Sequence, residues 1–246
     1  MKKTIYLGVI TLITIGCVLY GVNNWYGGNI GFSWSFGIGN SKYNIEESAT
    51  LEAFDSITID AAVMDLVVKE GSAYTLDYRG TKNLVMSYKV DDGKLVITQK
   101  KKGNMIGNNS AVMTLTVPAD TQFERADIRI GVGDIDMNKQ RVNTLDADID
   151  VGDIEVESTV FDEVIIDSDT GDVDLSDCSF TRLDIVTDVG DVEVDSSIDI
   201  SEYTYDLKTD VGEVEVGAEE YGRKYKQDGK NGGIVIHGDV GDITVN

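Results

Sequence analysis

The sequence predicts an all-β fold: a single-stranded parallel β-solenoid (β-helix) preceded by an N-terminal transmembrane helix. Three observations predict it. A phrase built on Val-Gly-Asp returns six times, apolar and polar residues alternate on both sides of each copy, and an uncharged run of 18 residues stands near the amino end. A period near 20 residues is typical of solenoids, in which each repeat buries its apolar face against its neighbours.

The uncharged run, residues 5–22, predicts a single-pass membrane anchor. As a helix it spans ~27 Å, close to the ~30 Å of a bilayer's hydrocarbon core. Lys2 and Lys3 precede it, so we expect a cytoplasmic N-terminus and an extracytoplasmic bulk. Two alternatives stay open: a cleaved signal peptide, and a lipoprotein processed at Cys17, because residues 14–17 resemble a lipoprotein box.

Residues 23–44 form a spacer rich in Gly and aromatic residues. Trp25 and Trp34 could lie at the outer headgroup level, where amphipathic rings are favoured. The alternative is a spacer whose aromatic rings pack on the first rung.

Residues 45–123 predict an N-terminal β region that caps the solenoid. The stretch 57–68 fits the repeat template if Met64 takes the glycine position, which predicts an initial rung. Residues 91–93, Asp-Asp-Gly, predict a hairpin turn, and residues 110–118 predict another strand. We expect partly antiparallel strands here, because an uncapped end would expose its backbone to aggregation.

Residues 124–246 carry the repeats. Their key glycines are separated by 19, 19, 19, 22 and 29 residues; they are Gly133, Gly152, Gly171, Gly190, Gly212 and Gly241. Apolar residues stand seven and five positions before each glycine and two and four after it, so each repeat predicts two short strands that meet at a glycine bend. We expect successive repeats to stack as parallel rungs ~4.8 Å apart, about seven with the initial rung. The carboxyl end shows no cap.

The net charge of −23 lies in the repeats. From Glu124 onward stand 33 of the 44 acidic and 10 of the 21 basic residues. Such a surface repels polyanions, so we expect no nucleic-acid partner.

In-register stacking would place the acidic residues in three files. Calcium could bridge neighbouring carboxylates, because it prefers hard oxygen ligands. The candidate calcium ligands are Asp153, Asp172, Asp191, Glu155, Asp174 and Glu193. The alternatives are a solvated, aggregation-resistant surface and an electrostatic trap for cationic peptides.

A long insertion, residues 217–233, separates the last two repeats and gathers cations in an otherwise acidic half. Long loops on rigid scaffolds are common binding elements. The candidate interaction residues are Tyr221, Arg223, Lys224, Tyr225, Lys226 and Lys230. The alternative is a solvated insertion held on the acidic face.

Catalysis has little support in the sequence. The single histidine, His237, takes an outward strand position, and Cys17 and Cys178 lie in a membrane segment and an inter-repeat corner. A Ser or Cys nucleophile therefore lacks the usual base. We expect no enzyme, no catalytic residues and no cofactor besides the possible calcium; the remaining alternative is an enzyme that acts on polysaccharides.

The anchor, the aromatic spacer, the strand pair ITIDAAVMDLVV, the segment DDGKLVITQKKKG and the tandem DVGDIEV phrases together resemble the LiaG-like family of bacterial envelope proteins, with its "putative adhesin" β-strand-repeat domain. The resemblance covers nearly the whole chain. It implies a parallel β-solenoid on the outer face of a membrane and a link to envelope-stress systems, and it supplies no site residues. We expect a noncatalytic, adhesin-like envelope interaction module with a protein, peptide or glycan partner, or else an accessory of an envelope-stress response.

Overall fold

The computed structural model describes residues 43–102 and 109–246. These residues form an all-β structure with no helix, and none of its elements is a helix of the length and apolar character needed to cross a membrane. The predicted anchor of residues 5–22, the spacer up to residue 42 and Cys17 lie outside the described residues.

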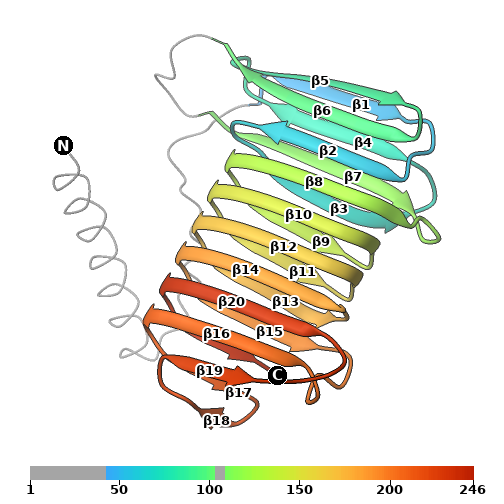
Figure 1. Ribbon diagram of the computed structural model, residues 1–246. Helices are drawn as coiled ribbons and strands as arrows, with labels where there is room; N and C mark the ends of the chain where they lie inside the picture. Colours follow the sequence, from blue (N-terminus) through green and yellow to red (C-terminus); the bar gives the residue numbers. More distant parts are fainter. Residues whose placement is uncertain (1–42, 103–108) are drawn as a thin grey trace, which may run out of the picture. The chain divides into compact units, whose positions relative to one another are not determined.

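Two sheets build the structure, and most of their strands run parallel (Figure 1). The ten-stranded sheet has the order β19-β16-β20-β14-β12-β10-β8-β2-β6-β5, and the eleven-stranded sheet has the order β1-β4-β7-β3-β9-β11-β13-β15-β21-β17-β18. The parallel strands of the ten-stranded sheet are β2 (Ser56–Ala61), β6 (Lys94–Lys101), β8 (Phe123–Val132), β10 (Arg141–Val151), β12 (Val160–Thr170), β14 (Arg182–Val189), β16 (Thr204–Val211) and β20 (Gly233–Val240). Those of the eleven-stranded sheet are β3 (Asp65–Gly71), β7 (Ala111–Pro118), β9 (Ile135–Asn138), β11 (Ile154–Glu157), β13 (Val173–Cys178), β15 (Val192–Ser196), β17 (Val214–Val216) and β21 (Ile243–Val245).

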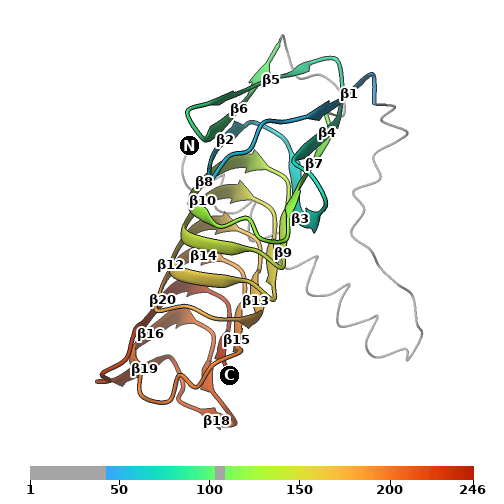
Figure 2. The same cartoon turned by 90° about the vertical axis from the view of Figure 1, so that its right-hand side faces the viewer.

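Each rung is one strand from each sheet, joined at a corner (Figure 2). β10 ends at Val151, and β11 begins at Ile154 beyond the corner glycine. Neighbouring rungs pair in register, for example Leu145 with Val164 and Ile154 with Val173. The alternating apolar residues of both sheets are buried between them in one hydrophobic core. The predicted period of two and the in-register stacking are confirmed, and the stack is consistent with a β-solenoid.

The corner requires glycine because the rungs approach each other there by their backbones. Gly171 has a φ of 143°, which L side chains rarely adopt, and a Cβ on it would lie 1.8 Å from the carbonyl oxygen of Gly152. The same clash recurs at each corner glycine of the repeats. Close stacking of the rungs therefore excludes a side chain at this point of the repeat.

The rungs do not follow the chain order throughout, which corrects the expectation of sequential stacking. β20 and β21, the sixth repeat, lie between the fourth repeat, β14 and β15, and the fifth, β16 and β17. Because every repeat has the same inward pattern, Ile234 pairs in register with both Leu183 and Tyr205. The insertion of residues 217–233 supplies the chain length that this crossing needs.

The amino-terminal part confirms the predicted initial rung and adds another. β2 and β3 pair in register with β8 and β9, which places Met64 at the glycine position, where it is fully buried. The hairpin at Asp92 and Gly93 joins β5 (Leu84–Asp91) to β6. β6 and β7 pair in parallel with β2 and β3 on the other side, so eight parallel rungs form instead of the predicted seven.

Antiparallel strands cover both ends of the stack. β1 (Ile45–Thr50), β4 (Thr75–Gly80) and β5 close the amino-terminal end. β18 (Glu219–Glu220) and β19 (Lys224–Gln227) close the other end on β17 and β16. The expectation of an uncapped carboxyl end is therefore wrong, because the insertion itself supplies the cap.

The corner geometry predicts a large cost for any side chain at Gly171. Gly171→Ala should lower the free energy of unfolding by more than about 3 kcal/mol, because it combines strained backbone with a clash against backbone atoms. Gly233→Ala is the matched control, since nothing lies within 4 Å of its added Cβ, and it should change the free energy by less than about 0.5 kcal/mol. Chemical denaturation of both variants measures the difference; equal effects would contradict the corner constraint.

Candidate functional site

The corner also positions a ladder of carboxylates along the stack. The backbone N–H of Asp153 donates to Oδ1 of Asp134 at 3.0 Å, that of Asp172 to Oδ1 of Asp153 at 2.9 Å, and that of Asp191 to Oδ1 of Asp172 at 2.8 Å. The ladder continues through Asp242 to Glu213. The aspartate that follows a corner glycine therefore accepts a hydrogen bond from a backbone N–H of the next rung. This gives the Gly-Asp pair a structural role.

Burial, together with neighbouring carboxylates, raises the pKa of two of these carboxyl groups, Asp172 and Asp65. Burial raises the pKa of Asp172 above its ordinary value of 3.8, the carboxylates of Asp191 and Asp153 raise it further, and the N–H of Asp191 opposes both. Burial likewise raises the pKa of Asp65, where the ladder begins. The charged forms of Asp65 and Asp172 are thus less favourable in the folded protein than in the unfolded chain.

The structure brings the six candidate calcium ligands into two files. Asp153, Asp172 and Asp191 belong to the ladder, whereas Glu155, Asp174 and Glu193 are register neighbours on β11, β13 and β15. Within residues 43–102 and 109–246, no group of three or more His, Cys, Asp or Glu side chains is placed to hold a metal ion. Calcium binding stays a prediction.

The candidate interaction loop forms the cap at the carboxyl-terminal side of the stack. Tyr225 packs edge-on against Tyr205 with ring centroids 5.5 Å apart, and the ring centroids of Tyr221 and Tyr225 are 4.3 Å apart. Lys226 Nζ lies 2.8 Å from Asp206 Oδ2. Arg223, Lys224 and Lys230 are exposed. Three of the six residues therefore attach the cap to β16 or to one another, and the binding role stays a prediction.

His237 and Cys178 do not form a catalytic arrangement. His237 is exposed on β20, as predicted, with Nε2 3.5 Å from Asp206 Oδ1. Lys226 and His237 together hold the pKa of Asp206 below its usual range. Cys178 is fully buried at the end of β13, and burial raises the pKa of its thiol to about 11. This thiol is protonated at neutral pH and closed to solvent.

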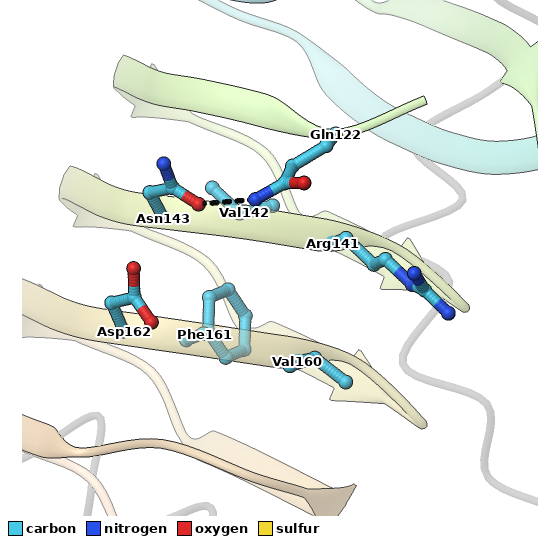
Figure 3. A pocket seen from close by; sticks show the side chains of 7 residues that line it. All are labelled: Gln122, Arg141, Val142, Asn143, Val160, Phe161 and Asp162. Atoms are coloured by element: carbon cyan, nitrogen blue, oxygen red, sulfur yellow. Dashed lines mark hydrogen bonds between the residues drawn. The ribbon is translucent and has the colours of Figure 1, made fainter. Parts of the chain in front are cut away.

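A hollow of about 300 Å³ opens at the start of β8, β10 and β12 (Figure 3). Gln122 Nε2 donates to Asn143 Oδ1 across it at 2.8 Å, and Arg141 and Asp162 supply its charges. The other lining residues are Val142, Val160 and Phe161. These side chains offer one cation, one carboxylate and apolar contact, but no nucleophile beside a base.

The sequence alone does not predict a row of residues at the corner, most of them exposed valines. The residue before each corner glycine is outside the core, and we call this row the valine ridge: Val132, Val151, Thr170, Val189, Val240 and Val211. Four of these valines, Val132, Val151, Val240 and Val211, have exposed fractions of 47%, 47%, 38% and 58%. The sequence signal for this row is the repeated Val-Gly pair. The alternation of apolar residues farther from the glycine does not show whether the residue directly before the glycine faces the core or the solvent.

The ladder geometry predicts different stabilities for two substitutions of Asp172. Asp172→Asn keeps an oxygen acceptor for the N–H of Asp191 but removes the charge, so it should raise the free energy of unfolding at pH 7. Asp172→Ala loses the acceptor and should be less stable than Asp172→Asn by about 1 kcal/mol.

The stability difference should also depend on pH. Because the folded pKa of Asp172 is raised, the wild-type carboxyl contributes stability below its unfolded value of 3.8 and loses it as the pH rises through the folded pKa. The advantage of Asp172→Asn should therefore shrink on acidification. Urea denaturation between pH 3.5 and pH 7 measures this, and an advantage that grows on acidification would contradict the account.

Solved structures resemble the chain at low identity. A "putative cell adhesion protein" from Clostridium sporogenes is 13% identical with a TM-score of 0.44, covering 82% of this chain and 98% of that one. A "putative adhesin" from Bacteroides fragilis is 14% identical with a TM-score of 0.45, covering 82% and 96%. A "putative lipid binding protein" from Parabacteroides distasonis is 13% identical with a TM-score of 0.32, covering 85% and 98%.

The comparison with curated proteins gives no match. The comparison with family models gives one over residues 54–245, which include all the parallel rungs described above. The chain therefore belongs to the Toastrack DUF4097 family.

Proposed function

We propose that the chain is a noncatalytic interaction module of the cell envelope, anchored in the membrane by residues 5–22 with its β-stack outside the cytoplasm. The stack is the single-stranded β-solenoid predicted from the repeats, with two rungs placed out of chain order. The observation that carries the proposal is repetition: the described surface presents the same carboxylates and valines rung after rung. A surface of this kind favours contact with an extended partner over chemistry at a single point.

The titratable groups support a noncatalytic role. A nucleophile needs an adjacent base or a lowered pKa. The thiol of Cys178 is buried with a raised pKa, and the imidazole of His237 faces the carboxylate of Asp206 on an exposed strand. The carboxylates repeat at equivalent positions, whereas a hydrolytic pair needs two carboxyl groups in different environments.

The negative charge of the repeats favours a partner that is not itself acidic. The excess of 33 acidic over 10 basic residues from Glu124 onward repels nucleic acids and anionic lipid headgroups at long range. A role as accessory to an envelope-stress response is the second candidate, favoured by the anchor, spacer and repeat phrases that resemble the LiaG-like family.

Protease accessibility tests the proposed placement. A full chain with a carboxyl-terminal tag should sediment with membranes, and external protease should remove the tag in intact cells while a cytoplasmic marker stays uncut. Deleting residues 8–19 should release the chain from the membrane fraction, because the remaining apolar run is too short to span ~30 Å. A tag protected until the cells are lysed would contradict the proposed placement.

Release of reducing sugar from envelope polysaccharide tests the noncatalytic assignment. We expect none above background from the purified full chain. Release that disappears when one carboxylate is neutralised would replace the proposal with a hydrolase.

A further inference from the structure

The valine ridge runs along the stack at the corner as a row of five valines and one threonine, Thr170. Val132 pairs with Val151, and Thr170, Val189, Val240 and Val211 are successive partners on β12, β14, β20 and β16. Single exposed apolar residues are ordinary on protein surfaces, but a contiguous row is typical of an interaction site. The corner at the other end of the short strands differs, because the residues with positive φ there are Lys139, Ser158 and Asp177 and not glycines.

Two files of carboxylates flank the ridge. The residues of one file directly precede the ridge residues in the sequence, and those of the other directly follow the corner glycines. The first file is Asp150, Asp169, Asp188, Asp239 and Asp210, and the second is Asp134, Asp153, Asp172, Asp191, Asp242 and Glu213. Among these described carboxylates, only Asp210 has an ion pair, with Lys208 at 2.6 Å. The ridge is therefore an apolar row between two largely unneutralised anionic rows.

The spacing of the rungs indicates the shape of a complementary partner. The six ridge positions, ~4.8 Å apart, extend over ~24 Å. A helix repeats its face every ~5.4 Å and covers this length with about 16 residues, whereas alternate residues of an extended strand are ~6.8 Å apart and lose register sooner.

We propose that the valine ridge with its two flanking files binds a cationic amphipathic helix. Aliphatic residues at three- and four-residue spacing lie on the valines, and Lys or Arg side chains on either border of that stripe reach the two carboxylate files. The charge complementarity excludes anionic membranes and nucleic acids as the occupant of this surface. The inference rests on the proposed function, since it names the class of partner for that interaction module.

A designed peptide tests the inference. The probe is a labelled 16-residue peptide of Leu and Lys with helical spacing, titrated against the full chain in zwitterionic nanodiscs, with empty discs as the blank. A scrambled isomer has the same charge without an apolar face. The chain should bind the scrambled isomer at least about tenfold more weakly, and the helical peptide should gain helicity on binding. Equal affinity for the two isomers would overturn the inference, because charge alone would then explain the binding.

Variants of the ridge locate the binding. Val151→Thr, Val189→Thr and Val240→Thr together should weaken binding of the helical peptide at least about tenfold, and Thr170 shows that a rung accepts threonine at this position. The matched control is Val85→Thr, Val160→Thr and Val186→Thr, whose valines are 42%, 51% and 42% exposed elsewhere on the structure; it should keep the affinity within about twofold. Equal losses in both triple variants would overturn the inference.

A capture experiment separates this inference from the proposed function. Parent and ridge variant are each used as bait on intact envelopes. If both capture the same components and the peptide does not bind, the ridge inference fails and the proposed function stands. If the peptide binds but neither bait captures anything, the proposed function fails.

Discussion

The structure depends on one constraint: at the corner of the six glycine-marked repeats, the backbones of neighbouring rungs come too close for a side chain to fit. A Cβ on Gly152 would lie 2.0 Å from the carbonyl oxygen of Gly133, and a Cβ on Gly190 would lie 1.8 Å from that of Gly171. The aspartate after five of the six corner glycines then accepts a hydrogen bond from the next rung, as Asp172 does from the N–H of Asp191. One short phrase therefore determines the bend, the stacking and a row of surface charge.

The surface chemistry follows from the same phrase. The residue before each corner glycine lies on the outside of the bend, so a valine there is exposed or half-buried. The acidic residues on either side of the Val-Gly pair form the flanking files. The cost is electrostatic, since carboxylates ~4.8 Å apart repel each other. Burial, the largest cause, and neighbouring carboxylates together raise the pKa values of Asp65 and Asp172, and the ladder hydrogen bonds partly offset both effects.

The ends of the stack meet a different constraint. A parallel rung with no neighbour exposes a row of unpaired backbone groups, which favours aggregation. Here β5 covers one end of the ten-stranded sheet and β19 covers the other. The cap at β19 is held by Tyr225 on Tyr205 and by Lys226 on Asp206, so the cations of the insertion have at least partly a structural purpose.

Much of the stack could be predicted from the sequence because its signals are local. Alternation identified the buried faces, Met64 could be placed at the glycine position from its neighbours alone, and Asp-Asp-Gly specified the hairpin before β6. The order of the rungs could not be predicted, because all repeats share one inward pattern and Ile234 fits against Leu183 as well as against Tyr205. The valine ridge was missed because exposure at a bend depends on backbone conformation, which alternation does not report. The candidate calcium ligands could be grouped from the repeat register, and the loop residues from their place in one insertion. Their hydrogen bonds and cap contacts could not be predicted, because they depend on the tertiary structure.

The chain order alone predicts a different stacking order for the last three rungs from the one in the structure. A cross-link tests the observed order directly. In a chain with Cys17 and Cys178 replaced, the pair Glu193→Cys and Thr244→Cys occupies register partners on β15 and β21, whereas β21 separates Glu193 from Glu215 on β17. Neighbouring strands lie ~4.8 Å apart, within reach of a disulfide, and next-but-one strands do not. The account predicts that mild oxidation links the pair 193 and 244 and leaves the pair 193 and 215 free; a disulfide between 193 and 215, with none between 193 and 244, would contradict it.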